Sequence, residues 1–107
     1  MRVCIFGAGA IGGHAAARMI STGVANVSIV ARGAHLAVIR QRGLILRTEG
    51  VEIGGRPVAA SDDPGQLPPQ DLVIVTLKAH AQPTAADSIA RLIAPGGLAL
   101  FWSAPIG

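Results

Sequence analysis

A glycine-rich turn near the N-terminus places the strongest constraint on how this chain can fold. Val3–Phe6 are four apolar residues in a row, which is typical of a strand buried on both faces. They lead directly into Gly-x-Gly-x-x-Gly, formed by Gly7, Gly9 and Gly12, and an alanine-rich helical pattern follows. A strand, this motif and a helix in succession are typical of a dinucleotide-binding site. We therefore predict such a site at the start of the chain.

Each glycine of the motif has a separate physical role. The first permits the sharp turn, the second lets the backbone approach a pyrophosphate, and the third lets the following helix pack closely on the strand. The free N–H groups and the positive dipole end of that helix then face the phosphates. The alternative interpretation is a glycine-rich connection between a strand and a helix that binds no ligand.

The residue after the second strand indicates which dinucleotide is bound. Residues Asn26–Ala31 form the second expected strand, and a strand, helix and strand at this spacing form a parallel βαβ unit. In NAD-binding domains an acid usually follows this strand and binds the ribose hydroxyls. Here Arg32 takes that position, and no Asp or Glu occurs between Met1 and Thr48.

A guanidinium at this position suits the 2′-phosphate of NADP(H), which it can bind bidentately, whereas a carboxylate would repel it. The sequence therefore favours NADP(H) over NAD(H), and His35 is a candidate for a second contact. The alternative is that Arg32 is a solvated residue at the end of a strand.

The rest of the pattern completes one α/β domain over residues 1–107, a Rossmann-like open parallel sheet with helices on both faces. Turn glycines between short β-type runs predict a small antiparallel excursion around residues 44–60. We expect the parallel strands in an order close to 3-2-1-4-5. The other expected elements are helices at Ala10–Thr22 (with Ile11, Ala15 and Met19 facing inward), Ala34–Arg42 and Ala81–Ala94, and strands at Asp71–Leu77 and Leu98–Trp102.

The single lysine of the chain lies at a position where a ligand contact is expected. Lys78 follows the apolar strand Asp71–Leu77, and ligands bind at the carboxyl ends of strands in open parallel sheets. Its ammonium could meet a phosphate or a substrate carboxylate. The alternative is a solvated lysine that ends a strand.

Composition excludes several other classes of function. The net charge of +3 comes from scattered arginines without alternating aromatics, which argues against nucleic-acid binding. The single cysteine, Cys4, lies in the first strand and is expected to be a small buried residue, so no disulfide forms within the chain. No apolar run reaches the length of a membrane span. We expect a cytoplasmic protein without a metal site.

Taken together, these residues resemble the N-terminal domain of the ketopantoate reductases (2-dehydropantoate 2-reductases). The resemblance covers nearly the whole chain. It is carried by Gly7–Gly13, by Val30-Ala31-Arg32 followed by His35-Leu36, and by Leu72–Ala79.

The resemblance implies an NADPH-dependent oxidoreductase that reduces the 2-keto acid 2-dehydropantoate to pantoate, on the route to pantothenate and coenzyme A. By position it implies that Arg32 holds the 2′-phosphate and that Lys78 lines the cofactor cleft near the nicotinamide. The pyrophosphate would be held by the turn, at Gly7, Ala8, Gly9, Ala10, Ile11 and Gly12.

The chain also departs from the family pattern. Family members carry a helical C-terminal domain that supplies the general-acid lysine and much of the substrate pocket, and these 107 residues do not include it. Where the family has Gln-Asn-Gly after the fifth strand, this chain has Ser103-Ala104-Pro105, so Ala104 replaces the asparagine that helps to place the substrate.

These departures leave three hypotheses for the function. The first is an incomplete reductase domain that binds NADPH but is weak or inactive alone, with no catalytic residue assigned. The second is a non-catalytic NADP-binding, sensing or interaction module that acts through a partner. The third is another NADP-dependent reductase that a second chain completes. Because the last strand is expected to be an unprotected edge, we also predict self-association.

Overall fold

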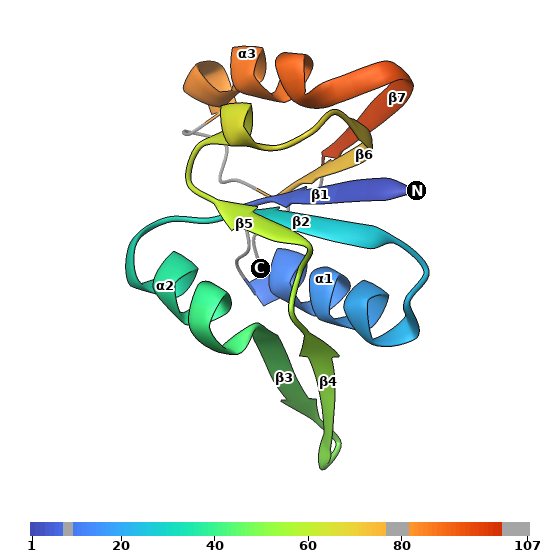
Figure 1. Cartoon of the computed structure of the whole chain (residues 1–107), viewed down its shortest axis with the longest axis vertical. Coiled ribbons are helices and arrows are strands. Elements are labelled where there is room, and N and C mark those ends of the chain that lie inside the picture. The colour runs from blue at the N-terminus through green and yellow to red at the C-terminus, as the bar shows by residue number, and fades with distance from the viewer. Residues whose placement is uncertain (8–9, 77–81, 102–107) are drawn as a thin grey trace, which may run out of the picture.

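A five-stranded parallel sheet forms the centre of the structure, a computed structural model that describes residues 1–7, 10–76 and 82–101 (Figure 1). Its strands lie in the order β5-β2-β1-β6-β7, and all neighbours are parallel. The strands are β1 (Arg2–Phe6), β2 (Asn26–Val30), β5 (Ala59–Ser61), β6 (Gln70–Val75) and β7 (Ile93–Phe101). Counted among parallel strands alone this is 3-2-1-4-5, so the predicted order is confirmed.

Helices cover both faces of this sheet, as predicted for a Rossmann-like fold (Figure 1). Helices α1 (Ala10–Thr22) and α2 (Gly33–Arg42) lie on one face. Helix α3 (Gln82–Leu92) and the short 3-10 helix η1 (Pro64–Gln66) lie on the other. The predicted antiparallel excursion is the hairpin of β3 (Leu44–Thr48) and β4 (Val51–Gly55), which forms a separate two-stranded sheet beside α1 and α2.

The central strand β1 shows why two cores form. Successive side chains of a strand point to opposite faces. Val3 and Ile5 belong to the core beneath α1 and α2, whereas Cys4 and Phe6 belong to the core beneath α3. Because both faces are covered, the four residues are all apolar, which produced the unbroken apolar run in the sequence.

The inward face of α1 differs from the expected stripe of Ile11, Ala15 and Met19. Ala15 and Met19 are only half-buried, and the Ile11 side chain lies outside the described residues. The most buried positions are instead Gly12, Gly13, Ala16 and Ala17. Small residues lie on this face because the helix approaches the sheet closely, and a longer side chain there would hold the two apart.

The boundary between α3 and β7 also differs from expectation. The helix was predicted to continue to Ala94, but it ends at Leu92, and β7 begins at Ile93 rather than at Leu98. The strand starts early because Ile93 pairs with Gln70, and the register then shifts before Leu72 pairs with Leu98. Pro95-Gly96-Gly97 falls in this irregular part of the strand, where Pro and Gly are tolerated.

Strand β7 forms one edge of the described sheet and carries exposed apolar side chains. Leu98, Leu100 and Phe101 are 58%, 47% and 57% exposed. No charged residue interrupts the strand. This pattern is consistent with the expected unprotected edge, and self-association stays a prediction.

None of the helices in residues 1–7, 10–76 and 82–101 has both the length and the apolar character that a membrane span requires.

Cys4 is fully buried, as expected, and its environment gives a pH prediction. Burial raises the pKa of the Cys4 thiol from 9.0 to about 12, because desolvation disfavours the thiolate. Above pH 9 the unfolded chain therefore loses a proton that the folded chain keeps. We expect the free energy of unfolding to fall by up to ~1.4 kcal/mol per pH unit between these two pKa values.

Chemical denaturation from pH 8 upward measures this effect, and Cys4→Ala is the control because it lacks the thiol. The wild type should lose more stability with rising pH than the variant. Parallel pH profiles for the two proteins would contradict the prediction. The thiol should also resist a disulfide reagent at pH 8 until the chain is unfolded.

Candidate functional site

The carboxyl ends of β2, β1 and β6 meet at one edge of the sheet, where the glycine turn begins. The Gly7 N–H donates to the Val30 carbonyl at 3.0 Å, and the Thr76 N–H donates to the Phe6 carbonyl at 3.0 Å. These two bonds continue the sheet beyond its last paired residues. The start of the turn is therefore fixed from both neighbouring strands, at the edge where open parallel sheets bind ligands.

Gly7 has the backbone conformation that the motif requires. Its φ of 91° lies in a region that residues with a Cβ rarely adopt. A glycine at this position lets the chain leave β1 sharply and enter α1 within a few residues.

Gly12 closes the other end of the turn, and no room exists for a side chain there. A Cβ at Gly12 would lie 2.8 Å from the Gly7 carbonyl oxygen, 2.8 Å from Thr76 Oγ1 and 3.0 Å from Ile5 Cγ2. The first turn of α1 therefore rests directly on β1 and on the end of β6. This close packing is what a dinucleotide-binding turn needs from its third glycine.

Thr76 is a site residue that sequence reasoning missed. Its hydroxyl lies 3.4 Å from the Phe6 carbonyl and also donates to the Gly7 carbonyl, so the end of β6 is linked to the glycine turn. In the sequence Thr76 is one residue of an apolar strand, and its partners lie 69 and 70 residues away. Nothing local in the sequence signals this contact.

Arg32 lies where the sequence placed it, just beyond β2 at the same edge of the sheet. It is exposed, takes the N-cap position of α2 with extended backbone (φ −133°, ψ 157°), and its side chain makes no capping hydrogen bond. Among the residues that the structure describes, the one ion pair joins Arg47 to Glu52, so the Arg32 guanidinium pairs with no carboxylate there.

Two acids, Asp62 and Asp63, follow strand β5, which pairs with β2. The Ala31 N–H donates to the Ser61 carbonyl at 3.1 Å, so the chain segments that follow β2 and β5 begin side by side. The Asp63 carboxylate already accepts a hydrogen bond from the Gly65 N–H at 2.9 Å. Neither Asp62 nor Asp63 forms an ion pair with Arg32 in the described part of the chain, so this guanidinium is free of a carboxylate partner there.

The histidines of the described residues have less specific positions. His35 is exposed in the first turn of α2, near Arg32 in sequence. His14 is exposed on α1, and its Nε2 accepts a hydrogen bond from Arg18 Nε at 2.8 Å. The His14 contact is that of a helix-surface residue.

Three predicted site residues lie outside the described residues, namely Ala8, Gly9 and Lys78, and so does Ala104, which replaces the asparagine of the family pattern. Ala10 and Ile11 begin α1, but their side chains are not described. The structure therefore brings together Gly7, Gly12 and Arg32 from the predicted set. The role of Lys78 stays a prediction.

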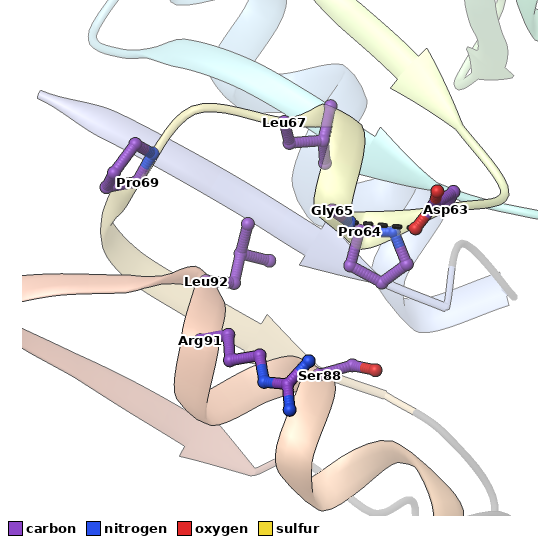
Figure 2. A pocket seen from close by; sticks show the side chains of 8 residues that line it. All are labelled: Asp63, Pro64, Gly65, Leu67, Pro69, Ser88, Arg91 and Leu92. Carbon is purple, nitrogen blue, oxygen red and sulfur yellow. Dashed lines mark hydrogen bonds between the residues drawn. The ribbon is translucent and has the colours of Figure 1, made fainter.

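A separate hollow of 280 Å³ lies on the α3 face of the sheet (Figure 2). It is lined by residues of the segment 63–69 on one side and by Ser88, Arg91 and Leu92 of α3 on the other. Figure 2 shows the hydrogen bond that the Asp63 side chain accepts from the Gly65 N–H at the start of η1. Its volume lies just below the ~300–1,000 Å³ that is usual for ligand pockets.

Comparison with known proteins agrees with this geometry. The family model for ketopantoate reductase PanE/ApbA matches residues 3–102. The chain belongs to the ketopantoate reductase family. The match includes both the glycine turn and the ends of β2 and β6.

Individual relatives support the same assignment. The chain is 47% identical over 93 residues to a 2-dehydropantoate 2-reductase of Mesorhizobium japonicum, which covers 87% of this chain and 28% of that protein. A crystal structure assigned as a ketopantoate reductase of Ralstonia solanacearum superimposes with a TM-score of 0.85 at 40% identity, covering 95% of this chain and 31% of that one. The chain thus spans about a third or less of the length of these relatives.

A third neighbour carries a bound cofactor. The ternary structure of D-mandelate dehydrogenase with NADH and anilino(oxo)acetate matches with a TM-score of 0.78 at 25% identity, over 100% of this chain and 34% of that one. The same domain therefore occurs in a protein that binds NADH.

Proposed function

We propose that this chain is the NADP(H)-binding part of a ketopantoate-reductase-type oxidoreductase. The observation that carries the proposal is the position of Arg32. An exposed guanidinium lies at the carboxyl end of β2 and pairs with no carboxylate of the described residues, and the glycine turn at the same edge of the sheet has the close packing of a dinucleotide-binding motif. A phosphate-bearing dinucleotide satisfies both features at once.

The residues of the chain then have distinct tasks in binding. Gly7 and Gly12 hold the turn and the start of α1 close to the sheet, so that the positive end of the helix faces the pyrophosphate. Arg32 binds the 2′-phosphate through charge-assisted hydrogen bonds. Lys78 follows Thr76 by two residues in the sequence, and it is proposed to line the cleft near the nicotinamide.

The chemistry proposed for the complete reductase is reduction of a 2-keto acid, with 2-dehydropantoate as the substrate. The bound cofactor would supply the hydride, and the protein must hold the carbonyl in place and provide a proton for the new alkoxide. No residue of the described part is assigned as that proton donor. Turnover is therefore proposed only for an assembly that also includes the part of the reductase fold that the relatives have beyond the region matched by this chain.

Cofactor titration tests the proposal directly. Increments of NADPH and of NADH are added to the full chain, and the fluorescence of the reduced nicotinamide is followed. We expect NADPH to bind at least ~10-fold more tightly than NADH, because a phosphate bound to arginine gains charge-assisted hydrogen bonds that a ribose hydroxyl lacks. Equal affinities would contradict the assignment of Arg32, and the absence of binding would contradict the proposed function.

A further inference from the structure

We infer that Thr76 is a positioning residue for the glycine turn, whose hydroxyl fixes the Gly7 carbonyl at the opening of the turn, beside the start of α1. The inference rests on the proposed function, because it concerns the same site. It adds a residue from β6, outside the Gly-x-Gly-x-x-Gly motif, to the determinants of cofactor affinity.

The first end of the turn is held by Thr76 through both its backbone and its side chain. The Thr76 N–H donates to the Phe6 carbonyl at 3.0 Å, and its hydroxyl donates to the Gly7 carbonyl next to it. On the opposite side, the Gly7 N–H donates to Val30 of β2 at 3.0 Å. The peptide that opens the turn is thus fixed from both flanking strands.

The second end of the turn, at Gly12, leaves no room for a side chain beside the same hydroxyl. A Cβ at Gly12 would lie 2.8 Å from Thr76 Oγ1 and 2.8 Å from the Gly7 carbonyl oxygen. The Gly7 carbonyl and the Thr76 hydroxyl that binds it therefore lie beside Gly12, where the first turn of α1 packs closely on the sheet. Residues 8–11, which the motif assigns to the pyrophosphate, connect these two ends in sequence.

The side-chain type at residue 76 matters for this role. Threonine is β-branched, so its χ1 angle is restricted and its hydroxyl keeps its direction with little entropic cost on binding. Serine would keep the donor but gain rotational freedom, and valine would keep the shape but lose the donor. We therefore expect the affinity for a pyrophosphate-containing ligand to fall in the order Thr, Ser, Val.

Two ligands separate this role from a general effect on the fold. NADPH contains both the pyrophosphate and the 2′-phosphate, whereas adenosine 2′-monophosphate contains only the phosphate that Arg32 is proposed to bind. In the full chain we expect Thr76→Val to weaken the binding of NADPH by about fivefold to tenfold, the size expected for one hydrogen bond. The affinity for adenosine 2′-monophosphate should be unchanged. Thr76→Ser should restore most of the NADPH affinity.

The matched control is Thr22→Val, the same substitution at an exposed threonine whose hydroxyl donates to Arg18 O at 3.0 Å at the far end of α1. This variant should bind both ligands as the wild type does. Thr76→Ala serves as a second variant, because it removes the hydroxyl without placing a methyl group beside Gly12; it should reproduce the selective loss. Thermal unfolding checks that each variant is folded.

The outcomes distinguish the inference from the proposed function. Folded Thr76→Val or Thr76→Ala that binds NADPH like the wild type would overturn the inference alone. Equal losses for both ligands would also overturn it, because they indicate a loosened domain rather than a displaced turn. A wild type that binds neither ligand would overturn the proposed function, and the inference with it.

Discussion

Replacement of Arg32 by glutamate is expected to weaken NADPH binding by about 100-fold, because hydrogen bonds to charged groups contribute ~1.5–3 kcal/mol each and the new carboxylate repels the 2′-phosphate. Binding of NADH should stay unchanged or become tighter, since an acid at this position can accept hydrogen bonds from the ribose hydroxyls. The preference between the two cofactors would then be reversed. Fluorescence titration with each cofactor measures the change.

The geometry makes Arg32 suitable for such a test. It is exposed at the N-cap of α2, with no capping hydrogen bond from its side chain, so its replacement should cost the fold little. The matched control is Arg42→Glu, which changes the net charge equally at the exposed opposite end of α2. If Arg42→Glu reduced NADPH affinity as strongly, the effect would be long-range electrostatics, and Arg32 would lose its assignment.

The sequence predicted the architecture because its strongest signals are local. Val3–Phe6 and the glycine motif are adjacent in the chain, and they identified β1, the turn and α1 together. Arg32 could be placed for the same reason: the end of β2 is defined by the apolar run before it. The antiparallel hairpin followed from turn glycines at short spacing.

The features that the sequence did not predict depend on contacts between distant segments. The hydroxyl of Thr76 meets Gly7 only because β1 and β6 are neighbours, and an apolar strand pattern gives no sign of it. The inward face of α1 was mistaken for a different reason. Alanine and glycine fill much of that helix, so apolar periodicity could not show that the smallest residues face the sheet.

The early start of β7 is a third case of a distant contact. Pro95-Gly96-Gly97 is a strong signal for the end of a helix, and the helix does end before it. Strand β7 nevertheless begins before these three residues, because Ile93 pairs with Gln70. Only the tertiary arrangement of α3 above β6 brings this pair together.

Replacement of Gly12 by alanine is the second change for which we expect a large effect. The new Cβ would meet a backbone oxygen, the Thr76 hydroxyl and the fully buried Ile5 at 2.8, 2.8 and 3.0 Å, and the backbone oxygen cannot move without disturbing β1. Helix α1 must therefore shift away from the sheet. Overpacking of this kind costs ~1–3 kcal/mol of stability, which chemical denaturation would measure.

The same shift should impair cofactor binding more than the loss of stability alone explains. Moving α1 takes its N-terminal N–H groups away from the pyrophosphate. We therefore expect the affinity for NADPH to fall by at least ~10-fold, the equivalent of one lost charge-assisted hydrogen bond. The control is Gly23→Ala at the other end of α1. Gly23 has a φ of 69° with nothing within 4 Å of a new Cβ, so this variant adds backbone strain without a steric contact.

The two glycine variants thus share a cost in stability but differ in their position relative to the site. Gly23→Ala should lose roughly 1 kcal/mol through its left-handed backbone and bind NADPH like the wild type. Gly12→Ala should lose both stability and affinity. If the two variants bound NADPH equally well, the close packing of α1 on β1 would serve only the fold, and Gly12 would have no role in cofactor binding.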